Sequence, residues 1–375
     1  MTLNRYIKTL IAMTATVAAL ALASCTESGD EPVTAKTFQT GLYITLGDVN
    51  DSRASRAPGD DTQYNPGAGY ENYIDLENRN IKVAFYDIDD KYLGELDEFD
   101  VIPMESVQNS KRYYLQGATK VNLSSGKFKV LVLANWPEYP AVMSFDNIWK
   151  EQFEYSAGSM PSATNLIPLY GILDVSLSPS AIKPDINVNL GNIHLLRSLA
   201  KIEVIYEDAS DSWTLSKLQL TNYNTKGFCG PTGITKQSDY VKNEWGLDYI
   251  DKPFIPAQPE PGNNLDFKPI EGQPNHYILY VPEYANKLAD GTLRHEAERA
   301  RLLVDFKESI LGERYSDIRN DALPGKPVVD ILRNNWYKIT IKKINEQTEV
   351  TFEVDVIPYK VVDLDPIFGL GKYTG

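Results

Sequence analysis

Residues 37–46, TFQTGLYITL, alternate between apolar and other side chains with a period of two. Successive side chains of an extended chain point to opposite faces, so every second residue shares a face. The residues on the apolar face are Phe38, Thr40, Leu42, Ile44 and Leu46. Burial of one large apolar side chain contributes about 1.5–3 kcal/mol, so this face needs a core to cover it. We therefore expect the segment to be the first strand of a β-sheet domain.

Short strand candidates separated by Pro, Gly and Asp continue along the chain. They comprise residues 81–88, 91–96, 112–116, 126–136, 165–177, 186–206, 213–223, 276–284, 300–307, 335–344 and 349–357. One helix is expected within residues 144–156, with Asp146 as its N-cap. Many short strands with such connections predict an all-β chain of two Greek-key β-sandwich domains in tandem. A Gly-Asn break places the domain boundary near Asn192.

The amino-acid composition limits the kinds of molecule that the protein is expected to bind. The chain has 375 residues, of which 42% are apolar and 23% charged, and this length suits two domains. The formal net charge is −14 and no cluster of Lys and Arg is present in the sequence. A protein that binds phosphates must be locally basic, so we expect no nucleic-acid partner and no anionic-lipid surface.

The N-terminus has the pattern of an export signal. Arg5 and Lys8 precede an apolar run over residues 9–22, and the run ends in Leu-Ala-Ser before Cys25. Small residues before such a Cys resemble the bacterial lipobox, in which Cys25 receives a diacylglyceryl group before cleavage leaves it N-terminal. Residues 1–24 are then a lipoprotein signal peptide, followed by an acidic tether. The alternative is an ordinary signal peptide that carries a Cys by chance.

The stretch SRASRAPGDD, residues 52–61, follows the first strand and has no apolar periodicity. It presents Arg53 and Arg56 among small and polar residues that have nothing to pack against. From the residues alone, such a segment is either an idle linker or a site of proteolytic cleavage.

Catalytic motifs are missing from the sequence. His194, His276 and His295 are scattered without the spacing of zinc ligands, and no Gly-x-Ser-x-Gly motif is present. Cys229 is the only cysteine besides Cys25, so no disulfide is expected once Cys25 is lipidated. We expect a protein that is not an enzyme and that binds no metal or cofactor.

Aromatic residues offer a different function. A surface platform for glycans is one use for such side chains, and core filling in a β-sandwich is the other. The residues concerned are Trp136, Tyr139, Trp149, Trp213 and Trp245. A surface glycan-binding lipoprotein is therefore the alternative function.

Several segments, in this order, resemble the fimbrillin family, the subunits of type V pili of Bacteroidales. They are the lipobox Cys25, SRAPGDD at 55–61, HLLRSLAKIEVIY at 194–206, LRNNWYKITI at 332–341 and FEVDVIPY at 352–359. The most telling pieces are Arg197 to Lys201, the pair Arg333–Asn334 with Tyr337, and Val356 to Tyr359.

The resemblance implies two transthyretin-like β-sandwich domains, at residues 57–192 and 193–359. It also implies an outer-membrane lipoprotein precursor that an Arg-specific protease of gingipain type trims. Cleavage is then expected after Arg56, before Ala57, with Arg53 as a second candidate. Residues 25–56 leave as a propeptide that carries the first strand, with Phe38, Leu42, Ile44 and Leu46. The mature form is expected in cell-surface fimbriae, joined head-to-tail to other fimbrial subunits.

The C-terminal tail, residues 360–375, carries a second alternating pattern. The residues of one parity are Val362, Leu364, Pro366, Phe368 and Leu370. This face would fill the groove that the first strand leaves in a neighbouring subunit, as a donor strand. The alternative is that the tail docks along its own second domain. A free tail would suit a shaft subunit and a docked tail a tip adhesin, and the sequence leaves both open.

Overall fold

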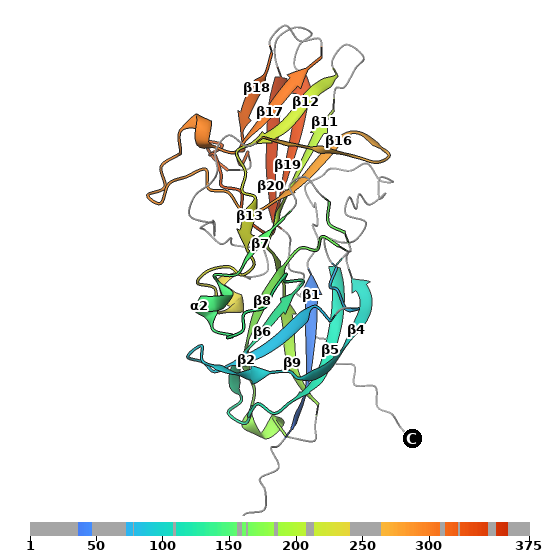
Figure 1. Cartoon of the computed structure of the whole chain (residues 1–375), viewed down its shortest axis with the longest axis vertical. Helices are drawn as coiled ribbons and strands as arrows, with labels where there is room; N and C mark the ends of the chain where they lie inside the picture. The colour runs from blue at the N-terminus through green and yellow to red at the C-terminus, as the bar shows by residue number, and fades with distance from the viewer. Residues whose placement is uncertain are drawn as a thin grey trace, which may run out of the picture. The chain divides into compact units, whose positions relative to one another are not determined.

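The computed structural model confirms an all-β sandwich fold (Figure 1). It describes residues 37–46, 73–77, 79–107, 110–155, 160–162, 164–183, 187–207, 214–240, 264–307, 312–321, 323–343 and 350–358. Within these residues, the apolar side chains form three core clusters: one from Phe38 to Leu195, a second from Ala200 to Val354, and a third whose members range from Ala84 to Tyr280. No helix in the described part of the chain is long and apolar enough to cross a membrane.

The first sandwich pairs two sheets. One has the strand order β4-β5-β1-β9 and the other the order β10-β8-β6-β2-β3. Their strands are β1 (Phe38–Leu46), β2 (Ile81–Tyr86), β3 (Tyr92–Glu95), β4 (Glu98–Val107), β5 (Ser110–Thr119), β6 (Lys127–Ala134), β8 (Leu169–Ser176), β9 (Val188–His194) and β10 (Leu196–Arg197). The apolar strand β6 lies inside its sheet and is buried on both faces, as its sequence predicted.

The second sandwich has sheets of order β15-β16-β11-β19-β20 and β14-β12-β17-β18. Its strands are β11 (Ala200–Tyr206), β12 (Leu215–Thr221), β14 (Asn264–Asp266), β15 (Lys268–Ile270), β16 (Gln273–Val281), β17 (Arg301–Phe306), β18 (Arg314–Asp317), β19 (Asn335–Lys343) and β20 (Val350–Pro358). Alternate residues of β11, among them Ile202 and Val204, enter the core of this sandwich.

A separate two-stranded sheet joins β7 (Gln152–Glu154) to β13 (Lys226–Phe228). The short helices are α2 (Phe145–Ile148), η2 (Pro179–Ala181), η3 (Gln237–Asp239) and η4 (Glu296–Glu298). The helix predicted within residues 144–156 is present as the short α2, and pairing with β13 places Gln152–Glu154 in a strand instead. The predicted cap was wrong, since the side chain of Ser144, not Asp146, accepts a hydrogen bond from Asn147 N at 3.4 Å.

The division between the sandwiches falls a few residues beyond the predicted one. Leu196 and Arg197 pair with Tyr170 and Leu169 of β8, so β10 still belongs to the first sandwich. The next strand, β11, starts at Ala200 in a sheet of the second. The continuous alternation across residues 195–206 concealed this switch of sheets.

Candidate strand-binding groove

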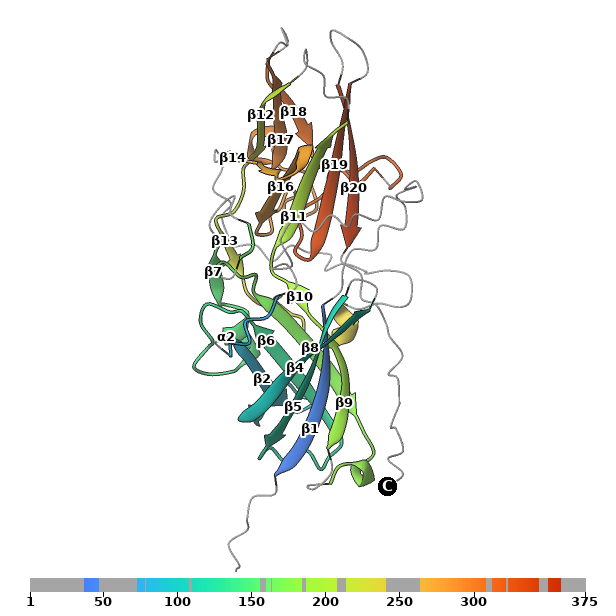
Figure 2. The same ribbon diagram turned by 90° about the vertical axis from the view of Figure 1, so that its right-hand side faces the viewer.

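Strand β1 is an inner strand of its sheet (Figure 2). It runs antiparallel to β5, with register from Phe38 opposite Thr119 to Leu46 opposite Lys111. On its other side it runs parallel to β9, with Thr45 opposite His194. A segment at the N-terminal end of the described chain therefore supplies both neighbours with ladder hydrogen bonds.

The predicted apolar face of β1 lies in the core of the first sandwich. The exposed fractions are 3% for Phe38, 1% for Leu42 and 0% for both Ile44 and Leu46. These side chains belong to one cluster with residues of both sheets, including Leu115 of β5 and Val130 of β6. Their burial is thus an observation, whereas their displacement during assembly stays a prediction.

Polar bonds fix the register of β1 between its neighbours. Thr40 Oγ1 donates to Gly117 O at 3.3 Å, and Thr45 Oγ1 donates to Asn192 Oδ1 at 2.8 Å. Gly41 leaves room for the ring of Tyr114, because a Cβ at this position would lie 2.2 Å from the hydroxyl oxygen of that residue. Removal of β1 would leave an apolar groove bordered by unpaired backbone groups of β5 and β9, which is a binding site for another strand.

Two of the sequence pieces that carry the family resemblance, Arg197 to Lys201 and the pair Arg333–Asn334, meet at one place in the fold. Arg197 is 1% exposed, and both its backbone N and its Nη1 donate to Asn334 Oδ1, at 3.2 and 3.1 Å. Asn334 in turn donates its backbone N to Leu199 O at 2.9 Å from a left-handed conformation with φ 56°. Ser198 Oγ is within hydrogen-bond distance of Pro168 O and Cys229 O, at 2.9 and 2.7 Å.

A buried ion pair completes this junction. Arg333 Nε and Nη2 donate to Glu283 Oε2 at 3.0 and 2.8 Å, and both side chains are at most 2% exposed. The same guanidinium donates to the carbonyls of Cys229 and Phe228, at 3.2 and 3.1 Å. From the sequence, Arg197 and Arg333 were identified only as members of motifs, without a structural role. Their role here is structural, and no local sequence signal pointed to Glu283 as the partner.

The residues considered for chemistry occupy structural positions. Burial raises the pKa of the Cys229 thiol to about 12, so the thiolate is disfavoured. Burial also lowers the pKa of His194 to about 4. His295 Nδ1 accepts a hydrogen bond from Ala297 N at 3.3 Å and so caps η4. Among the described residues, no group of three or more His, Cys, Asp or Glu is arranged to hold a metal ion.

Of the aromatic residues proposed as a glycan platform, those that the structure describes belong to packed positions. Trp136 is 1% exposed, donates Nε1 to Leu169 O at 2.8 Å and stacks on Tyr139 with ring centroids 6.3 Å apart. Trp149 packs beside Phe145 at 5.5 Å. Trp213 and Trp245 lie outside the described residues. The described aromatics therefore favour the core-filling interpretation.

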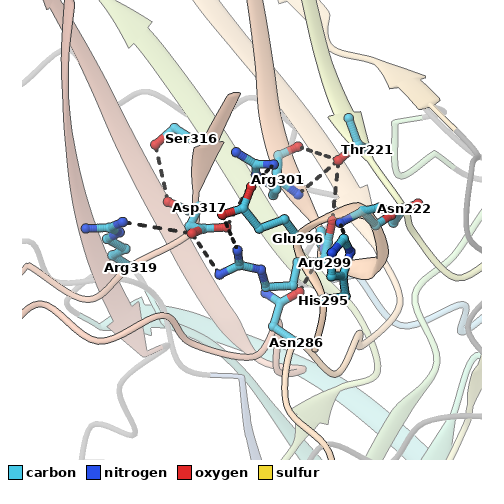
Figure 3. Close-up of polar contacts among 12 residues, drawn as sticks. Thr221, Asn222, Asn286, His295, Glu296, Arg299, Arg301, Ser316, Asp317 and Arg319 are labelled. Carbon is cyan, nitrogen blue, oxygen red and sulfur yellow. Dashed lines mark hydrogen bonds and ion pairs between the residues drawn. The ribbon is translucent and has the colours of Figure 1, made fainter. Parts of the chain in front are cut away.

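A cluster of ion pairs lies in the second sandwich, around Asp317 of β18 (Figure 3). Asp317 faces Arg299, Arg301 and Arg319 at 2.9, 3.4 and 3.9 Å. Arg301 also stacks over the ring of Tyr315 at 5.0 Å, beside an open pocket of about 420 Å³. The ring face is therefore already occupied by a cation. The cluster ties the loop at η4 to the hairpin β17–β18, and it does not present a free platform for a sugar.

The remaining predicted site residues lie outside the described residues. They are the lipidation site Cys25, the cleavage residues Arg53, Arg56 and Ala57, and the donor residues Val362, Leu364, Phe368 and Leu370. The structure therefore describes the proposed groove and its present occupant.

Comparison with known proteins rests on structure. No family model matches the sequence, and no curated protein matches it. The tip fimbrial protein Mfa3 from Porphyromonas gingivalis, with a C-terminal truncation, has a TM-score of 0.52 and 14% identity over 86% of this chain and 100% of its own. A fimbrial assembly protein from Parabacteroides distasonis has a TM-score of 0.44 and 16% identity, over 86% of this chain and 100% of its own. The fold is that of a Bacteroidales fimbrial protein, which confirms the resemblance at the level of fold.

Proposed function

From this fold, we propose that the chain is a structural subunit of a cell-surface fimbria that assembles by donor-strand exchange. The observation that supports the proposal most is the position of β1, an inner strand at the N-terminal end of the described chain whose apolar face is buried in the core. The precursor is exported as an outer-membrane lipoprotein through Cys25. It is then cut after Arg56 by an Arg-specific protease.

Cleavage turns β1 from a covalently attached strand into a separately bound ligand. Before the cut, the strand is held at a high effective concentration by its own chain. After the cut it is a ligand that can leave, and the groove then accepts a strand of similar pattern. The tail supplies Val362, Leu364, Phe368 and Leu370 on one face. Because the tail of one subunit fills the groove of the next, the contact is heterologous and generates a filament.

The processing step is tested by changing both arginines. The Arg53→Ala, Arg56→Ala double variant should accumulate as full-length lipoprotein without polymer, measured by intact mass of surface material and by the polymer ladder on gels. An Arg79→Ala variant retains both Arg53 and Arg56. It serves as the control and should polymerise. Pili of normal length from the double variant would contradict the cleavage proposal.

The donor role of the tail is tested by deleting residues 360–375. The deleted chain should fold as a monomer, show the thermal midpoint of the intact precursor and fail to elongate. Unchanged polymer ladders would show that another segment is the donor.

A position at the tip of the same fimbria is the second candidate, because Mfa3, the structure with a TM-score of 0.52, is a tip fimbrial protein. Immunogold labelling of surface fimbriae distinguishes the two positions. Labelling along the shaft supports a shaft subunit, whereas label only at distal ends supports a tip subunit.

In neither position is the chain proposed to have enzymatic activity or a cofactor. A surface lipoprotein that binds glycans without assembling would instead keep its acylated Cys25 and an intact first strand.

A further inference from the structure

We propose that Gln237 and Tyr240 are positioning residues for strand exchange, because they hold β9 in place while β1 is absent. Both belong to residues 231–240, here called the strap, which follow β13 and contact the first sandwich at β8 and β9. The inference rests on the proposed function, since it matters only if β1 leaves.

Strand β9 is the wall of the groove that depends most on β1. It is the edge strand of its sheet, and β1 is its only neighbour in the described strand order. Departure of β1 removes the ladder bond from Leu195 N to Thr45 O at 3.1 Å and the bond from Thr45 Oγ1 to Asn192 Oδ1. The opposite wall, β5, keeps its pairing with β4. Without other support, an incoming strand would have to order β9 as it binds, which lowers its affinity.

Gln237 supports β9 from its outer side. Its Oε1 accepts from His194 N at 3.1 Å, and its Nε2 donates to Asn192 O at 3.3 Å. The ladder toward β1 uses the backbone N of Leu195, and the backbone groups of successive residues in a strand alternate between its two sides. Asn192 O and His194 N therefore face away from β1. The side-chain amide makes the pair of bonds that a further strand would make, and both bonds are independent of β1.

Tyr240 fixes the C-terminal end of β9 to the other sheet. Its hydroxyl oxygen lies 2.9 Å from His194 O, and 3.0 and 3.1 Å from the backbone N and O of Ile172 in β8. Gly171 permits this approach of the two strands, because a Cβ there would lie 2.8 Å from His194 O. Tyr240 is 2% exposed, so water does not compete for these bonds.

The strap is itself anchored to a strand that belongs to the other sheet and does not pair with β1. Tyr170 of β8 donates its hydroxyl to Ile234 O at 2.6 Å, and β8 pairs with β6 and β10. The described contacts thus connect β9 through Gln237 and Tyr240 to β8. This route is complete without β1, so the groove keeps both walls when it is empty.

The test measures how fast the groove takes up a strand. The full chain is cut after Arg56 and separated from its own first strand, a fluorophore-labelled peptide of residues 37–46 is added in excess, and uptake is followed by fluorescence anisotropy. The peptide probes the groove without assuming that the tail is the donor. Gln237→Ala should slow uptake roughly tenfold, the effect expected when two hydrogen bonds no longer maintain the binding-competent state. Tyr240→Phe retains the ring but lacks the hydroxyl, and it should also slow uptake of the peptide.

Gln219→Ala is the matched control. Gln219 of β12 likewise makes two hydrogen bonds through its amide, here to side chains of the second sandwich: it donates to Asp266 Oδ1 at 2.7 Å and accepts from Asn264 Nδ2 at 3.3 Å. It should leave uptake unchanged. The uncut Gln237→Ala precursor should unfold within a few degrees of the uncut control variant. After the cut, hydrogen exchange at His194 N–H should be faster in Gln237→Ala than in the control.

The outcomes separate the two proposals. If the cut wild-type chain takes up the peptide and Gln237→Ala takes it up equally fast, the positioning role is overturned and the exchange mechanism stands. Equal slowing in Gln219→Ala also overturns the positioning role, because the effect is then general. If the cut wild-type chain takes up no peptide, the proposed exchange itself is overturned.

Discussion

Leu42→Ala tests whether β1 becomes a ligand after cleavage. Leu42 lies near the middle of β1 and is 1% exposed, within the core cluster of the first sandwich. Loss of a buried leucine side chain costs about 3 kcal/mol, through lost transfer energy and the cavity left behind. In the uncut chain, we expect this loss in the free energy of unfolding of the first sandwich, measured by urea titration.

In the cut chain, the same substitution should act on strand binding. Each 1.4 kcal/mol is a factor of ten, so a loss of about 3 kcal/mol corresponds to a dissociation constant raised roughly 100-fold. The assay follows release of the strand, labelled at its N-terminus, when the cut protein is diluted. The Leu42→Ala chain should release the labelled strand faster and retain a smaller fraction of it.

Leu302→Ala provides the control for this prediction. Leu302 is also a leucine at 1% exposure, but it lies in β17 and in the core of the second sandwich. It should lower the stability of its own sandwich by a similar amount and leave strand release at the wild-type rate. Equal release from the Leu42→Ala and Leu302→Ala chains would refute the assignment of β1 as a separable strand.

Three further predictions concern the junction and the buried titratable groups. Glu283→Gln leaves the Arg333 guanidinium buried without its counter-charge, and should lower the free energy of unfolding by about 3 kcal/mol in urea titration. Burial lowers the pKa of His194 to about 4, so the unfolded chain binds a proton that the folded chain does not between pH 6.5 and 4. Stability should therefore be fully present above pH 6.5 and fall by up to roughly 3 kcal/mol toward pH 4, and His194→Gln should flatten that part of the profile. Burial raises the pKa of Cys229 to about 12, so the folded chain should resist iodoacetamide at pH 8 while the urea-unfolded chain reacts, and rapid alkylation of the folded chain would contradict this.

The strands that sequence reasoning identified have strong patterns of their own. The alternation in residues 37–46 and the apolar run in residues 126–136 each suffice to define a strand, and the structure has β1 and β6 there. Strand β4 was missed because Glu98, Asp100 and Pro103 break its pattern. It is an edge strand, which tolerates charge and proline where an inner strand does not.

The contacts that support the groove could not be predicted from local sequence patterns. Gln237 bonds residues 43 and 45 positions earlier in the chain, and Arg333 bonds a carboxylate 50 positions earlier. Neither contact has a spacing that a helix or hairpin would impose. The apolar face of β1 was predictable because one segment carries it, whereas the walls around that face are assembled by the tertiary fold.

If the chain assembles as proposed, the mixed pairing of β1 would give the fibre a polarity. Because β1 is antiparallel to β5 and parallel to β9, a replacement can restore the same rungs on both sides only by entering in the same direction as β1. A strand inserted backwards would meet the wrong pattern on each flank. Under the proposed function, every joint then has one permitted orientation, and no subunit in the fibre is reversed.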